Sequence, residues 1–139
     1  MTAQEIIDHL KLEQHPEGGW FRETWRADSP GRATGTCIYF LLAAGESSHW
    51  HRVDATEIWL YHAGAPLILS LSATDDGPAT DQILGPDLSK GAPQLIVPEN
   101  HWQAACTTGD YTLVSCTVSP GFQFDGFELA APGFDIARG

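Results

Sequence analysis

Residues 45–64, GESSHWHRVDATEIWLYHAG, contain the stretch that decides the fold. Side chains alternate between the two faces of a β-strand, so His49 and His51 are expected to point the same way. Glu57 lies on the next expected strand. If the two strands pair as a hairpin, two imidazoles and one carboxylate converge on a single point.

Two histidines and a carboxylate in this arrangement suit a borderline divalent metal and leave coordination positions free for a substrate. The alternative is structural: one histidine is a hydrogen-bonded interior residue, and the other lies at the end of a strand. An H-x-H pattern alone is a weak signal. The nearby Glu57 and the flanking Gly45 and Gly64 are what favour a metal-capable site.

Frequent turns divide the rest of the chain into short segments. The 14 glycines and 9 prolines favour short strands over a helix bundle. One amphipathic helix is expected within Met1–Leu12, where Thr2 and Glu5 form a capping-box pattern. Further strands are expected at Trp20–Arg26, Thr36–Ala43, Glu57–His62, Pro66–Ser72, Gln94–Val97 and Tyr111–Ser119. This spacing predicts an all-β antiparallel sandwich or closed barrel.

Length and charge narrow the class of protein. The 139-residue chain has the size of one domain, and its 42% hydrophobic content argues against disorder. Its formal net charge is −11, and the only basic residues after Val53 are Lys90 and Arg138. Nucleic acids and anionic membrane surfaces are therefore not expected as partners.

Cysteine usage and the N-terminal residues bear on location. Cys37, Cys106 and Cys116 form an odd set without a CxxC pair, which fits a reducing compartment. The first residues lack the basic start and apolar run of a signal peptide. The longest apolar run, Ile38–Ala44, is too short to cross a bilayer. We expect a cytoplasmic protein.

The spacing Gly45, His49, His51, Glu57, Gly64 resembles the first motif of the cupin superfamily. Residues 91–103 resemble the second motif, with Gln103 at the place of a histidine.

A closer resemblance covers nearly the whole chain. It is to a family of small single-domain cupins, largely uncharacterised and described as predicted sugar epimerases. The resemblance implies a single cupin domain over 1–139, with a helix at 1–14 and a jelly-roll β-barrel at 15–139. The matching segments are His15–Glu23, Ile38–Leu42, Glu57–Trp59, His62–Gly64 and Trp102–Ala104.

The resemblance also implies a set of metal ligands. Superfamily metal sites usually have three histidines and one glutamate, and the matching positions here are His49, His51, Glu57 and Gln103. An amide oxygen is a weaker ligand than an imidazole. We therefore expect a divalent metal (Zn, Ni, Mn or Fe) to be bound weakly or to be absent, and Gln103→His to tighten binding.

An epimerase would remove a proton beside a carbonyl and return it to the other face. His51 is the candidate base and Tyr61 the candidate acid. Arg22 is expected to hold a phosphate or carboxylate of the ligand. Trp59, Tyr61 and Phe40 are expected to line the substrate pocket.

Structural roles are the alternative for several of these residues. Trp59 and Tyr61 can be ordinary barrel core, and Arg26 is expected to pair with an acid such as Glu23 or Asp28. The protein is expected to bind a small polar molecule, such as a sugar derivative, either as an enzyme or as a non-catalytic binder or sensor. We also expect it to form a homodimer.

Overall fold

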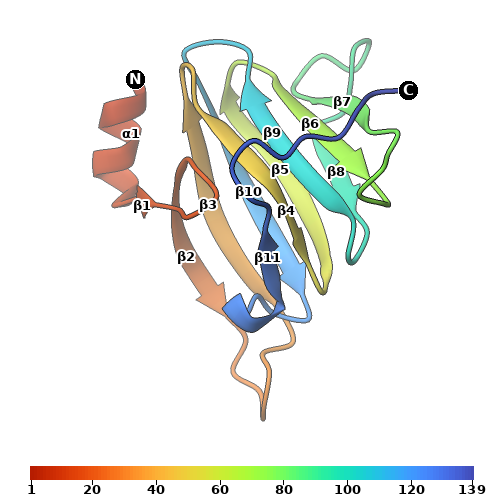
Figure 1. Ribbon diagram of the computed structural model, residues 1–139. Helices are drawn as coiled ribbons and strands as arrows, with labels where there is room; N and C mark the ends of the chain where they lie inside the picture. Colours follow the sequence, from red (N-terminus) through yellow and green to blue (C-terminus); the bar gives the residue numbers. More distant parts are fainter.

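The computed structural model describes residues 1–139 and shows two β-sheets packed face to face, with one short helix outside them (Figure 1). The elements are α1 (Ala3–Leu10), β1 (Glu13–Gln14), β2 (Trp20–Arg26), β3 (Thr36–Ala43), β4 (Ser47–Val53), β5 (Thr56–Gly64), β6 (Leu67–Ser72), β7 (Thr80–Leu84), β8 (Gln94–Val97), β9 (Trp102–Thr107), β10 (Tyr111–Ser119), the 3-10 turn η1 (Phe124–Gly126) and β11 (Phe127–Leu129). One sheet has the order β1-β2-β3-β10-β5-β8, the other β11-β4-β9-β6-β7. All strand pairs are antiparallel.

Helix α1 begins where the capping-box pattern predicted. The Thr2 hydroxyl accepts from the backbone N–H of Glu5, and the Glu5 carboxylate accepts from the backbone N–H of Thr2, both at 3.1 Å. Ile6 and Ile7 are buried against Leu41 on the outer side of β3. The helix therefore covers part of the six-stranded sheet and lies outside the space between the sheets.

The space between the sheets holds the main hydrophobic core. Its members come from both sheets and include Phe40, Leu42, Trp59, Leu69 and Val114. Phe40 and Trp59 pack edge to face, with ring centroids 5.7 Å apart. This core fills one part of the inter-sheet space and leaves the part near β2 open to a cavity.

Register shifts interrupt three strand pairs, β5–β10, β2–β3 and β4–β9, and the shifts in β4 and β2 lie at the cavity. In β4 the register shifts between Ser48 and His51, so both of these residues face inward although they are three apart: His51 lines the cavity, and the buried Ser48 donates to Glu17. The expectation that His49 and His51 share a face is wrong for this reason. In β2 the register shifts between Glu23 and Trp25, and Glu23 and Arg26 face the same cavity.

The predicted all-β fold with one N-terminal helix is confirmed, but the bounds expected for the helix, 1–14, are wrong. The helix ends at Leu10 because Lys11 adopts a left-handed backbone conformation, and Glu13–Gln14 form strand β1. The expected strands that became β2, β3, β8 and β10 have the predicted bounds. Four strands were not predicted: β1, β7, β9 and β11. Two of these, β1 and β11, have only two and three residues, and β7 is exposed at four of five positions. No helix is long and apolar enough to span a membrane.

Candidate active site

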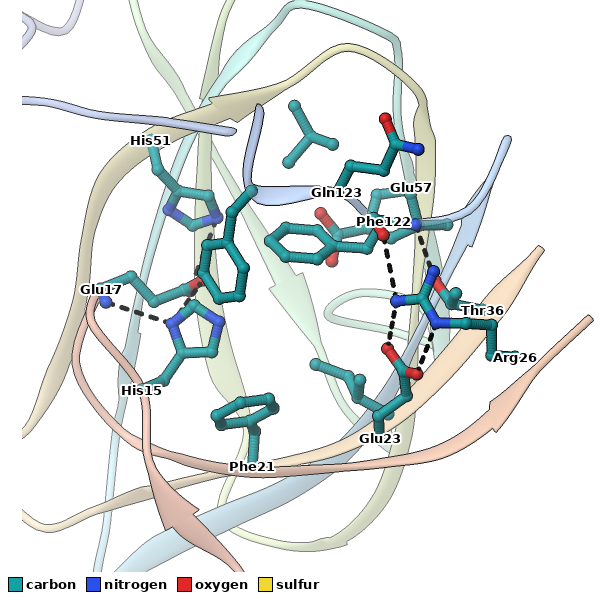
Figure 2. A pocket seen from close by; sticks show the side chains of 14 residues that line it. His15, Glu17, Phe21, Glu23, Arg26, Thr36, His51, Glu57, Phe122 and Gln123 are labelled. Atoms are coloured by element: carbon teal, nitrogen blue, oxygen red, sulfur yellow. Dashed lines mark hydrogen bonds and ion pairs between the residues drawn. The ribbon is translucent and has the colours of Figure 1, made fainter. Parts of the chain in front are cut away.

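A cavity of about 280 Å³ lies between the two sheets near β2. Its wall contains six charged or titratable side chains: His15, Glu17, Glu23, Arg26, His51 and Glu57. Figure 2 shows His15, Glu17 and His51 together at one end and Glu23 with Arg26 at the other. The cavity therefore has a buried acid–imidazole end and an ion-paired end.

The segment 15–19 places two of these groups inside the barrel. The backbone N–H of His49 donates to the carbonyl of Glu17 at 2.7 Å, and that of Gly18 donates to the carbonyl of His15 at 3.0 Å. Gly18 has a φ of +107°, and a Cβ there would collide with the carbonyl oxygen of Ser47. Glycine thus lets the segment lie directly against β4, with Glu17 turned into the cavity.

Glu17 is the most perturbed carboxyl group of the site. The Ser48 hydroxyl donates to its Oε2. His51 Nε2 lies 3.5 Å from that oxygen, and His15 Nδ1 lies 3.3 Å from Oε1. Burial raises the pKa of Glu17 to about 8, although the Ser48 hydrogen bond opposes the rise. Glu17 is accordingly mostly protonated at pH 7.

The two imidazoles are neutral and have defined tautomers. His51 Nδ1 lies 2.7 Å from the carbonyl oxygen of His49, which can only accept, so Nδ1 carries the hydrogen and Nε2 presents its lone pair. His15 Nδ1 accepts from the backbone N–H of Glu17 at 3.1 Å. Burial lowers the pKa of His15 to about 4 and also lowers that of His51, against the opposing effect of Glu57.

Glu57 reaches the cavity from β5, on the opposite sheet from His51. Gln103 Nε2 donates to Glu57 Oε1 at 2.8 Å, and Trp59 Nε1 donates to Gln103 Oε1 at 2.9 Å. Burial raises the pKa of Glu57 to about 7, and the neighbouring Glu17 adds to the rise, while His51 and Gln103 oppose it. Glu57 is therefore divided between its two protonation states near neutral pH.

The other end of the cavity is an ion pair beside aromatic rings. Arg26 Nε and Nη2 donate to the two carboxylate oxygens of Glu23 at 2.9 and 2.8 Å, and Nη2 also donates to the carbonyl of Phe122 at 3.1 Å. The expected pairing of Arg26 with an acid is confirmed. Phe21, Phe122 and Phe124 add apolar surface to the same cavity.

Several residues predicted for the substrate site lie elsewhere. The Arg22 guanidinium lies 6.0 Å from the centre of the Tyr39 ring and does not line the cavity. The Tyr61 hydroxyl donates to the carbonyl of Gly64 at 2.6 Å, again away from the cavity. Phe40 and Trp59 belong to the hydrophobic core next to the site. The interpretation of Trp59 as barrel core agrees with this placement.

The four expected metal ligands do not converge. His49 Nε2 lies 2.9 Å from the carbonyl oxygen of Ala131, outside the cavity. Gln103 turns its NH₂ group, a donor, toward Glu57, and leaves no oxygen for a cation there. No group of three His, Cys, Asp or Glu side chains is arranged to hold a metal ion. The residues present do not fit a divalent metal.

Sequence reasoning missed His15 and Glu17 as cavity residues. The available signal was the acid placed directly before Gly18 and Gly19. A glycine pair permits close backbone approach, so the side chain before it can be held in a buried position. The bulges in β2 and β4 left no comparable signal, because nothing in the local sequence marks the extra residue.

The fold and the cavity together define a small cupin: a double-sheet β-barrel with one ligand-sized interior site. The family model described as Cupin superfamily (DUF985) matches residues 4–130, and the chain belongs to this family. The predicted membership of the cupin superfamily is thereby confirmed. No curated protein matches the chain.

Three solved structures show how far this likeness extends. A protein from Shewanella oneidensis is 41% identical, with a TM-score of 0.89 over 94% of this chain and 85% of its own. A hypothetical protein from Leishmania major is 30% identical, with a TM-score of 0.87 over 96% of this chain and 90% of its own. Oxalate decarboxylase from Bacillus subtilis is 12% identical, with a TM-score of 0.65 over 84% of this chain and 29% of its own. At that identity the last comparison shows the fold alone.

Proposed function

We propose that the protein is a proton-transfer enzyme of the epimerase or isomerase type that acts on a small polar carbonyl compound. One observation carries this proposal: His51 and Glu57, from opposite sheets, face one cavity that also contains the buried acid Glu17. Buried titratable groups with shifted pKa values in a cleft are typical of acid–base catalysis.

His51 and Glu57 are the proposed proton carriers. His51 comes from β4 of one sheet and Glu57 from β5 of the other, so a ligand held in the cavity could be approached from two directions, as inversion at a carbon requires. Glu57 has a pKa of about 7, so it can both accept and release a proton at neutral pH. His51 offers the lone pair of Nε2, because its Nδ1 hydrogen is held by a backbone carbonyl.

Glu17 is the proposed acid in place of Tyr61. When a carrier removes the proton beside the carbonyl, the C–H electron pair forms a C=C bond and negative charge moves to the carbonyl oxygen. A protonated carboxyl group can donate a hydrogen bond to that oxygen. Return of a proton to the opposite face of the carbon restores the carbonyl and inverts the centre.

Solvent deuterium exchange tests the proposal. The protein in D₂O is incubated with a panel of free and nucleotide-linked keto and aldo sugars, and deuterium beside the carbonyl is followed by NMR. We expect exchange with wild type, and a loss of about 100-fold or more in His51→Asn and Glu57→Gln. Tyr61→Phe, which lies outside the cavity, should exchange like wild type. Absence of exchange across the panel would contradict the enzyme proposal and favour a binding role.

A further inference from the structure

We propose that the cavity selects uncharged ligands, and that Glu23 determines this specificity by cancelling the charge of Arg26. The inference rests on the proposed function for the identity of the site, and it narrows the substrate class to neutral polyhydroxylated carbonyl compounds. Sugars that carry a phosphate, a carboxylate or a nucleotide diphosphate are excluded.

The first support is the geometry of the ion pair. Both carboxylate oxygens of Glu23 are occupied by Arg26, and the guanidinium also donates to the carbonyl of Phe122. Such a two-point contact is the arrangement with which arginine would otherwise hold a phosphate or carboxylate. The bulge in β2 allows the pair to form in the solvent-accessible part of the cavity wall, since it turns Glu23 and Arg26 to the same side.

The second support is the charge of the remaining wall. Arg26 is the only lysine or arginine among the lining residues. Both lining histidines are neutral at pH 7, because burial lowers their pKa values. The other titratable groups are the carboxyls Glu17 and Glu57, which can only repel an anion when ionised. An anionic ligand would therefore find no unpaired positive charge inside.

The third support is that the groups lining the cavity, and its volume, suit a small uncharged ligand. Phe21, Phe122 and Phe124 present rings suited to the C–H faces of a sugar ring, and the buried carboxyl groups can hydrogen-bond to hydroxyls. The volume of about 280 Å³ lies just below the usual range for small-molecule sites, about 300–1,000 Å³. It suits one small molecule better than a nucleotide-linked one.

The test converts the cavity into an anion site. Glu23→Gln keeps the size of the side chain and removes its charge, which leaves Arg26 unpaired. Binding of D-glucuronate, glucose 6-phosphate and inorganic phosphate is measured by titration calorimetry at low salt, with D-glucose as the uncharged reference. We expect wild type to bind these anions at least about tenfold more weakly than Glu23→Gln does.

Three variants isolate the cause. Glu23→Gln combined with Arg26→Gln should lose the gained affinity, and Glu23→Asp should still reject anions. Glu128→Gln is the matched control, because Glu128 forms a 2.8 Å ion pair with Arg52 that does not line the cavity. The Glu23–Arg26 pair is partly exposed, with side chains 33% and 44% accessible, so these variants are expected to fold.

Two results would overturn the inference. One is wild-type binding of an anion that Arg26→Gln abolishes. The other is no gain of anion binding in Glu23→Gln. Neither depends on turnover, so a failure of the deuterium-exchange experiment and a failure of this one are separate results.

Discussion

The indole N–H of Trp59 donates to Oε1 of Gln103 at 2.9 Å, and this single contact determines which end of the amide faces Glu57. An indole nitrogen can only donate, so the amide oxygen must face Trp59. The NH₂ group is then directed at Glu57. A residue of the hydrophobic core thus sets the hydrogen bonding of a proposed proton carrier.

Trp59→Phe should raise the pKa of Glu57 above its value of about 7. The ring remains, but Gln103 loses the partner that orients it and can turn its oxygen toward the carboxyl group. An amide oxygen favours the protonated acid, whereas the NH₂ group favours the carboxylate. NMR titration of ¹³C-labelled glutamate carboxyl groups measures the change.

Trp50→Phe is the matched control for that substitution. Trp50 is also buried, and its indole donates to the Asp135 carboxylate at 2.8 Å, outside the cavity. Its loss should leave the Glu57 titration unchanged. An equal shift in both variants, or none in Trp59→Phe, would show that Trp59 does not orient the amide.

Metal binding by Gln103→His should depend on Trp59. An imidazole that coordinates a metal through one nitrogen carries a hydrogen on the other, and that N–H would face the indole N–H. We expect wild type to bind Zn, Ni, Mn or Fe(II) weakly or not at all. Gln103→His should bind somewhat more tightly, and Trp59→Phe combined with Gln103→His about tenfold more tightly again. Calorimetric titration measures the series, and equal affinity of the single and double variants would count against this explanation.

The stability of the protein should fall as the pH rises from 6.5 to 8. Folded Glu17 and Glu57 keep their protons up to about pH 8 and 7, whereas unfolded glutamates lose them near 4.5. The unfolded state then binds fewer protons in this range, and the free energy of unfolding decreases on the order of 1–2 kcal/mol. Between about pH 4 and 6.5, His15 has the opposite influence on the free energy of unfolding. Its pKa is about 4 in the folded state, so the unfolded state binds more protons at this position and stability rises with pH.

Chemical denaturation across this pH range measures that dependence. Glu17→Gln removes the larger contribution, so its unfolding free energy should change less between pH 6.5 and 8. Glu128→Gln, on the exposed outer side, should behave like wild type. A wild-type profile that rises over this interval would contradict the assignment of Glu17 as a buried acid.

Gly18→Ala should displace the segment that holds Glu17. The new Cβ meets the Ser47 carbonyl oxygen, in addition to the cost of a positive φ. Gly133→Ala is the control, because Gly133 also has a positive φ, +86°, but no atom lies within 4 Å of its added Cβ. We expect Gly18→Ala to lose roughly 2 kcal/mol or more beyond the control, and to lose the pH dependence due to Glu17. Equal destabilisation would mean that the close contact is not needed.

The sequence predicted the parts of this structure that depend on regular periodicity. The strands at 20–26, 36–43 and 111–119 have hydrophobic patterns long enough to show their bounds, and the capping box defines the start of the helix. Which residues line the cavity depends instead on β-bulges, which interrupt that periodicity. A bulge reverses the alternation on one side of it, so counting by twos assigned His49 to the interior. Arg22 was expected at the ligand for another reason, because it is one of the few cations of the chain.

Glu17 shows a second limit. It reaches the cavity from a segment between two strands, and its position depends on a backbone contact with β4 that is distant in sequence. Such a contact has no periodic signature. Of the four residues expected to converge inside the barrel, Glu57 and His51 line the cavity, and Gln103 is buried beside them with its NH₂ group donating to Glu57.

The bulge in β4 also affects how related chains should be compared. Two chains can both contain H-x-H and match letter for letter, yet present different histidines to the interior if only one has the extra residue. Here Ser48 and His51 occupy the interior positions that an unbulged strand would give to residues two apart. Whether a related chain has the same ligand or catalytic residues therefore depends on the geometry of this strand as well as on its sequence. A one-residue insertion or deletion near His49 could change which side chains enter the site and leave the barrel intact.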